Sequence, residues 1–324
     1  MKYLSNLFAA IILSVPLHVW GQQEAMFGQY IFNNSVISPA QAGANHENQW
    51  GAIARSQWMG IDGAPRTESI YANLRLPRQI GLAFGLYQDR LGPEKNLHFM
   101  TDVAYHARLT EDWRLAGGIR LIMSNFRMNY TDIPNIQPGD PFFQEDLTSG
   151  LLINVGAGLL AYNGTYYFGI STPRAFGSHL EVLDSQIGDG NPNVNIKDIV
   201  SRHYFAYAGA NYILSDETTF LPSVLVRHVI DAPLQTDLNA IFGYRNMLEA
   251  GVFLRSNLVE KHNRVDAIGL LIGIRFLPNW HFGYLYEYPV SDIKLGSRQT
   301  HEVSLRFLLE PRHDRVVIHP RFFL

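Results

Sequence analysis

The sequence lacks cysteine altogether and has few charged residues for a chain of 324 residues. Without cysteine there is no disulfide bond, no thiolate metal ligand and no thiol nucleophile. Charged residues make up 17% of the chain, against about a quarter in typical soluble domains. The formal net charge of −3 gives no reason to expect a nucleic-acid partner.

Long apolar runs are also scarce. One run, Leu7–Val15, follows Lys2, and Val19–Gly21 offers a small residue at a cleavage position before Gln22. This arrangement predicts a signal peptide over residues 1–21, because the run is shorter than the roughly 20 residues of a membrane-spanning helix. Later stretches fall short of the roughly 18 unbroken apolar residues of such a helix, so a helical membrane protein is not expected.

Alternation of apolar and polar residues is abundant. In residues 97–109 apolar side chains such as Phe99 occupy one face of an extended chain, and polar side chains such as Asp102 occupy the other. After a polar break at 110–112 the alternation resumes over 113–124. Two such runs around a short break predict a β-hairpin. Runs of about 10–12 residues suit tilted strands that cross a bilayer, with one face in lipid and the other in a polar lumen.

The pattern predicts an all-β fold, a transmembrane antiparallel β-barrel of about 14 strands of the outer-membrane type. The candidate strands are 48–57, 67–76, 79–88, 97–109, 113–124, 150–161, 164–171, 202–213, 218–228, 234–243, 247–255, 264–275, 280–288 and 301–308. In 202–213 aromatic residues occur at both parities, so the two faces of that strand are not assigned. The alternative is a soluble all-β sandwich with one wet face.

The connections alternate between tight turns and longer loops. The tight ones are 77–78, 110–112, 163–164, 215–217, 245–246 and 277–279, and the longer ones are 58–66, 89–96, 125–149, 172–201, 229–233, 256–263 and 289–300. A membrane barrel has this asymmetry because its short turns face the periplasm and its long loops face outward. We therefore expect a barrel over 48–309 with both barrel termini periplasmic, a periplasmic N-terminal segment at 22–47 and a periplasmic tail at 310–324.

Motifs that would carry chemistry are weak. Gly156–Ala161 has the letters of a dinucleotide fingerprint but lies inside a predicted strand, where the required turn into a helix is missing. Residues 189–195 begin like a calcium loop, yet valine stands where that loop needs glycine and glutamate, so a weak cation site there stays open. Three histidines, His98, His106 and His281, fall on the predicted lumen face. No catalytic constellation, cofactor or metal site is expected.

Residues 55–67, Arg-Ser-Gln-Trp-Met-Gly-Ile-Asp-Gly-Ala-Pro-Arg-Thr, resemble the signature of the PorP/SprF family. Residues 29–33 and 39–43 resemble the N-terminal motif of that family, although Ser38 stands where the family usually has Asn. Further similar stretches extend to 320–322. The motif residues are Arg55, Gln57, Trp58, Gly60, Asp62, Gly63, Pro65 and Arg66.

The resemblance implies a non-enzymatic protein of the outer membrane in the type IX secretion system of gliding and related Gram-negative bacteria. It implies a role in secreting or holding adhesins at the cell surface. The implied partners are adhesin cargo and secretion components, including periplasmic ring or peptidoglycan-linked proteins. Alternatives are a diffusion porin and, behind it, an outer-membrane hydrolase.

The residues of the signature itself leave two interpretations open. Asp62–Gly63 and Ala64–Pro65 form turns readily, and Arg55 and Arg66 flank the loop where they could brace it. Trp58 is an apolar residue at the base of the loop, either part of an interfacial girdle or a docking surface. The loops at 125–149 and 172–201 are the longest, and we expect them to meet cargo.

Overall fold

The computed structural model describes residues 27–45, 47–129, 147–176, 178–183, 193–200, 202–230, 232–259, 262–290 and 299–309. Among these residues, no helix has the length and apolar character needed to cross a membrane. The strands are β1 (Asn48–Ser56), β2 (Arg66–Leu76), β3 (Ile80–Leu91), β4 (Glu94–Arg108), β5 (Arg114–Met128), β6 (Leu147–Thr148), β7 (Leu152–Tyr162), β8 (Tyr166–Arg174), β9 (Ser178–Leu183), β10 (Asn193–Val200), β11 (His203–Ala210), β12 (Tyr212–Ser215), β13 (Thr218–Val229), β14 (Leu234–Tyr244), β15 (Leu248–Val259), β16 (His262–Leu277), β17 (Trp280–Pro289) and β18 (Thr300–Leu309).

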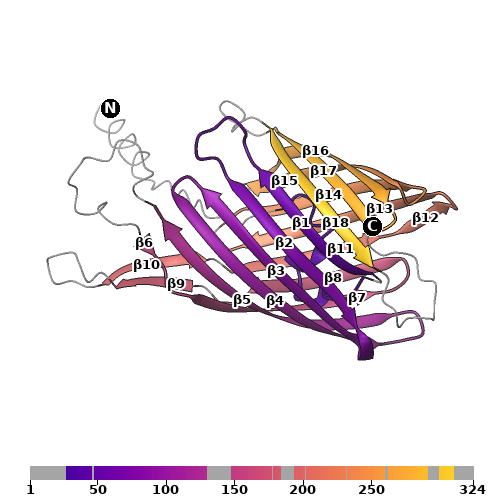
Figure 1. Cartoon of the computed structure of the whole chain (residues 1–324), viewed down its shortest axis with the longest axis horizontal. Helices are drawn as coiled ribbons and strands as arrows, with labels where there is room; N and C mark the ends of the chain where they lie inside the picture. Colours follow the sequence, from indigo (N-terminus) through magenta and orange to yellow (C-terminus); the bar gives the residue numbers. More distant parts are fainter. Residues whose placement is uncertain are drawn as a thin grey trace, which may run out of the picture.

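Fourteen strands form one closed antiparallel barrel, as the alternation predicted. The barrel closes where β1 pairs with β18, from Asn48 opposite Leu309 to Ser56 opposite His301. The short β6 adds to the end of β5, and β12 continues the line of β11 after a break at Asn211. Figure 1 shows the long tilted strands of this wall. Each predicted strand corresponds to one strand of the wall.

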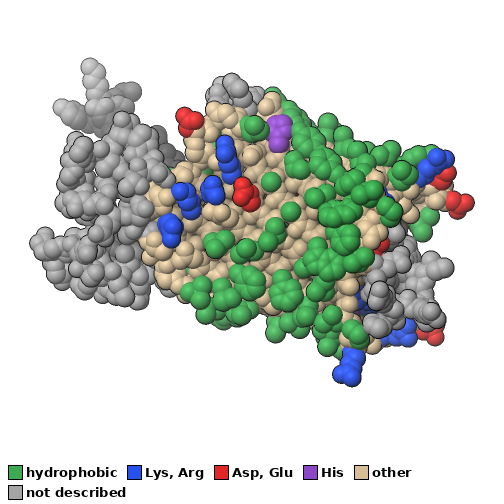
Figure 2. Space-filling model, in the orientation of Figure 1, with side chains coloured by type: hydrophobic (Ala, Val, Ile, Leu, Met, Phe, Trp, Pro, Cys, Tyr) green, Lys and Arg blue, Asp and Glu red, His purple; other side chains and the backbone are tan. Residues whose placement is uncertain are grey.

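The two faces of the wall have the predicted polarity. On β4, Phe99 and Tyr105 lie on the outer face, 38% and 55% exposed, whereas Asp102 between them is fully buried in the lumen. Figure 2 shows the outward apolar side chains gathered on the face that it presents. On β11, where the pattern was ambiguous, Tyr207 points into the lumen and Tyr204 points outward. This outer surface is suited to lipid, as in transmembrane barrels.

The barrel has a turn end and a loop end. The turn end carries the tight connections, among them the η3 turn (Pro77–Gln79) and the Arg245–Asn246 turn. Arg78 and Gln79 in the first turn and both residues of the second have positive φ. Asn48 and Leu309, the ends of the wall, also lie there, because they pair with each other and the β1–β2 connection lies at the opposite end.

Two connections at the loop end are shorter than predicted. The loop expected at 89–96 is a turn between Leu91 and Glu94, and the loop expected at 256–263 is also short, because β15 and β16 extend into it. These strands continue past the apolar band, where polar residues pair as well as apolar ones and the alternation no longer marks the strand. Within the predicted loop 172–201, β9 and β10 form a separate antiparallel hairpin.

The N-terminal segment differs most from expectation. Residues 22–47 were expected in the periplasm, but residues 27–45 lie inside the barrel, and we call these residues the plug. The plug contains two short 3-10 helices, η1 (Asn34–Val36) and η2 (Pro39–Gln41). Nearly all of its side chains are buried. The plug has no charged residue, so its side chains enter the lumen without leaving an ion unpaired.

Candidate functional site: a plugged lumen

The plug is attached to β18 through the carboxylate of Glu302, which is fully buried. The backbone N–H groups of Gly28 and Gln29 donate to its two oxygens at 2.7 and 2.8 Å. The Gln29 side chain also donates to the backbone carbonyl of Glu302 at 3.0 Å and accepts from Ser304 at 2.7 Å. Hydrogen bonds to a charged group are stronger than neutral ones. This cluster therefore fixes the start of the plug.

Further bonds join the plug to the wall around its circumference. Four wall side chains donate hydrogen bonds to backbone carbonyls of the plug: Gln49 Nε2 to Phe32 O (2.8 Å), Arg120 Nη1 to Val36 O (3.1 Å), Ser171 Oγ to Ile37 O (2.6 Å) and His106 Nε2 to Ala42 O (2.7 Å). In the other direction, Asn73 Oδ1 accepts a hydrogen bond from the backbone N–H of Gly43 at 2.6 Å. A buried backbone group without a partner costs stability. The lumen wall supplies the partners that a sheet or helix would otherwise give.

The plug runs the length of the lumen from one end to the other. Gly43 binds Asn73, which lies near the turn end of β2, and Gly28 binds Glu302, which lies near the loop end of β18. Phe27 packs edge-on against Tyr87, also near the loop end. The chain therefore passes through the lumen from the loop end to the turn end, where it enters β1.

A chain of alternating charges crosses the lumen wall near the loop end. Asp237 accepts from Arg255 Nε at 2.9 Å and from Arg227, and Arg255 also donates to Glu287 at 3.2 Å. Arg55 then donates to Glu287 at 3.0 Å and to Glu302 at 2.9 Å. These side chains are all less than 10% exposed. Through Glu302, the chain of charges ends on the plug.

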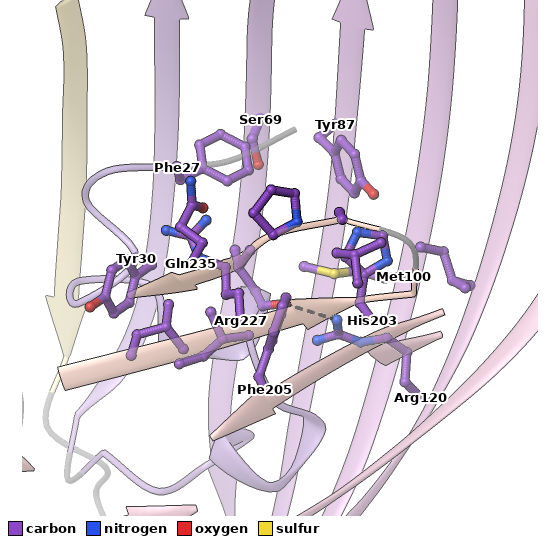
Figure 3. A pocket seen from close by; sticks show the side chains of 17 residues that line it. Phe27, Tyr30, Ser69, Tyr87, Met100, Arg120, His203, Phe205, Arg227 and Gln235 are labelled. Atoms are coloured by element: carbon purple, nitrogen blue, oxygen red, sulfur yellow. Dashed lines mark hydrogen bonds between the residues drawn. The ribbon is translucent and has the colours of Figure 1, made fainter. Parts of the chain in front are cut away.

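A mostly apolar cavity of about 60 Å³ lies between the plug and the wall, enough for a few water molecules. Figure 3 shows the plug residues Phe27 and Tyr30 at this cavity, with Arg120, His203 and Arg227 from the wall. Such a cavity is not a continuous aqueous channel.

Two neighbouring glycines of β5 test how closely the plug fits. A Cβ on Gly118 would lie 2.4 Å from the carbonyl carbon of Pro39 in the plug, whereas a Cβ on Gly117 would face outward, 3.8 Å from Leu159. We expect Gly118→Val to destabilise the barrel by about 1–3 kcal/mol, as overpacking does. Gly117→Val, the matched control, should change the stability little. Urea unfolding of both variants in lipid measures the difference, and equal losses would show that the plug does not press on β5.

The signature residues divide between the lumen, the loop and the outer wall. Arg55 lies in the lumen, where it forms ion pairs with the carboxylates of Glu287 and Glu302. Arg66 lies exposed on the outer face of β2 and braces nothing inside. Within the loop, Gly60 and Gly63 have φ of 96° and 74°, conformations that favour glycine. Gln57 N–H donates to Pro65 O at 2.9 Å and closes the loop base.

Bonds from neighbouring connections hold the same loop in place. Met59 N–H donates to Gln299 O at 3.0 Å, and Gly92 N–H donates to Gly63 O at 2.8 Å. Trp58 is half-buried and Asp62 is exposed. The backbone of the loop is therefore braced on both sides, while some of its side chains face outward.

The weak motifs do not form a chemical site. Gly156–Ala161 lies inside β7 and is part of the wall. Residues 189–192 of the candidate cation loop lie outside the described residues, and 193–195 belong to β10. His98, His106 and His281 are buried on the lumen face, as predicted. Within the described part of the chain, no three histidine or acidic side chains are grouped to hold a metal ion.

The sequence interpretation missed the plug, although a signal was present. Residues 27–45 hold no Asp, Glu, Lys or Arg, but they include four large apolar or aromatic residues within Phe27–Phe32. A leader in water would expose those side chains. An uncharged segment of this length next to a polar lumen indicates burial.

Comparison with known proteins adds the family. A sequence profile described as "Type IX secretion system membrane protein PorP/SprF" matches residues 19–307. No curated protein sequence matches the chain significantly. Among solved structures, a CymD monoaromatic hydrocarbon channel has a TM-score of 0.53 at 10% identity, covering 89% of this chain and 94% of that one. A Pseudomonas aeruginosa FadL homologue has a TM-score of 0.47 at 10% identity, covering 90% and 95%. The first similarity supports the barrel fold alone.

Proposed function

Because this chain belongs to the PorP/SprF family of type IX secretion system membrane proteins, we propose that it is a non-catalytic barrel of the outer membrane that helps secretion or surface attachment of adhesin-type cargo. In this proposal the loop end faces outward and the turn end faces the periplasm. That orientation rests on the rule that long loops are external and short turns periplasmic.

The observation that carries the proposal is the plugged lumen. A diffusion porin needs a water-filled channel, whereas this lumen holds an ordered plug with bonds to β1, β2, β4, β5, β8 and β18. A filled barrel serves better as a scaffold. Its working surfaces are then its ends, with the signature loop 57–65 and the longest loops at one end and the tail 310–324 proposed at the other.

Affinity purification tests the proposal directly. We expect the full-length protein, tagged after Leu324 and extracted from outer membranes in detergent, to bring down a large secreted adhesin or periplasmic ring or peptidoglycan-linked proteins. An unrelated barrel of the same membrane with the same tag is the control. Mass spectrometry identifies the partners and shows which end of the barrel is used.

Deleting the gene gives the second measurement. The proposal expects surface adhesin, measured by antibody labelling of intact cells, to fall sharply in the deletion strain and return on complementation. A wild-type level of surface adhesin would overturn it. A purified barrel that has no partner and conducts steadily in planar bilayers would support the porin alternative. Turnover of a lipid or peptide substrate would support the hydrolase alternative.

A further inference from the structure

Four basic residues form a row across the outer wall at the loop end. Arg66 on β2 pairs in register with Arg90 on β3, Arg90 pairs with Lys95 on β4, and Lys95 pairs with Arg127 on β5. Adjacent strands are about 4.8 Å apart, so the row spans roughly 15 Å on this spacing. We call these four residues the basic row.

The side chains of the basic row face away from the lumen. Their neighbours in the strands, Thr67 and Asn96, are buried on the lumen side, and successive side chains of a strand alternate between faces. Arg66, Arg90 and Arg127 are exposed, and Lys95 is half-buried. Figure 2 shows basic side chains in a row beside the apolar surface.

Acidic residues around the basic row are few. Glu68 shares the outer face of β2, and Asp62 lies in the adjacent loop. Asp89 faces the lumen side and accepts from Thr67 at 2.6 Å, and Glu94 accepts from Asn96 at 2.7 Å. Like charges placed directly opposite on adjacent strands destabilise a sheet. Lys95 has a further interaction within the chain, and Arg90 donates to the neutral Gln88 side chain at 3.3 Å. The positive charge of the exposed Arg66, Arg90 and Arg127 therefore favours an anion from outside the chain.

The basic row lies where the apolar band ends. On β4 the next outward residues after Lys95 are Leu97 and Phe99, 47% and 38% exposed. Two residues of a strand span about 6.6 Å. The cations thus stand one step beyond side chains suited to the hydrocarbon, at the level of lipid headgroups.

We propose that the basic row binds the phosphate-bearing headgroups of the lipid leaflet at the loop end. The inference rests on the membrane placement and orientation proposed above. Arginine forms paired hydrogen bonds with phosphate, and a line of such groups matches a headgroup that carries more than one phosphate. Lipid reaches this wall because the apolar surface continues directly below the row, whereas an acidic soluble protein would have to dock against the membrane-facing side.

Native mass spectrometry of the purified full-length protein tests this inference. The probes are lipid A, which carries two phosphates, and zwitterionic phosphatidylcholine. The test variant is R66Q/R90Q/K95Q/R127Q, and the control is R78Q/R108Q/R245Q, which removes exposed cations at the turn end. We expect wild type and control to retain lipid A and the test variant to lose about tenfold or more of that binding, since each basic residue near an anionic lipid surface contributes.

Equal retention of lipid A by the test variant and wild type would overturn the inference, as would equal binding of both lipids by wild type. Loss of a co-purified acidic protein with unchanged lipid A binding would assign the row to a protein partner and also overturn it. The binding should weaken with salt, because exposed charges are screened. The assay contains no secretion component, so its failure is distinguishable from failure of the proposed scaffold function.

Discussion

A protein lacking residues 27–45 should conduct ions through a lumen that the full-length barrel keeps closed. These residues are almost entirely buried and fill the interior between the walls. Barrels of eight strands fill their interior with wall side chains alone, whereas 16–18 strands leave an aqueous channel; a barrel of this intermediate size should show conductance steps about tenfold or more above those of the full-length protein. Single-channel recording in planar bilayers measures the change.

A second variant separates an opened pore from a misfolded barrel. Replacing residues 27–45 by a Gly-Ser segment of equal length keeps the tether and the length of the chain. It removes the buried aromatic side chains such as Phe27 and Phe32 and the side-chain bonds of Gln29 with β18. It should conduct like the deletion and still migrate as a folded barrel in unheated gels. If both variants fold and neither conducts, then the plug does not close the lumen, and the wall side chains do so themselves.

The wall of this barrel was predictable from sequence for a physical reason. Each strand separates two environments, so its side chains alternate with period two over more than ten residues, as Phe99, Asp102 and Tyr105 do on β4. The signal faded where strands leave the apolar band. Leu91 and Glu94 still pair beyond that band, although the sequence there looks like a loop.

The interior could not be predicted in the same way. The plug consists of turns and short 3-10 helices, which have no long period, and its burial depends on a wall that is built from distant residues. Likewise, Arg55 and Glu302 are 247 positions apart in the chain and meet because β1 and β18 close the barrel. Without that pairing register, the sequence placed Arg55 beside the signature loop as a brace but did not show that its partners lie in the lumen.

Arg55→Met should be among the most destabilising single changes in the barrel. Its guanidinium is fully buried and joins Glu287 to Glu302, so removing it leaves two buried carboxylates with one cation fewer between them. Breaking a buried ion pair from one side costs about 3–5 kcal/mol. Urea unfolding in lipid, followed by tryptophan fluorescence, measures this loss.

The matched control is Arg245→Met, which breaks the pair with Glu217 at 2.8 Å where both side chains are about half exposed, 57% and 48%. Such surface pairs contribute about 0–1 kcal/mol. Arg55→Lys should recover part of the loss, because one ammonium restores the charge but does not span two carboxylates as the planar guanidinium does. Equal losses in Arg55→Met and Arg245→Met would mean that the lumen charges are hydrated and that Glu302 holds the plug without help from Arg55.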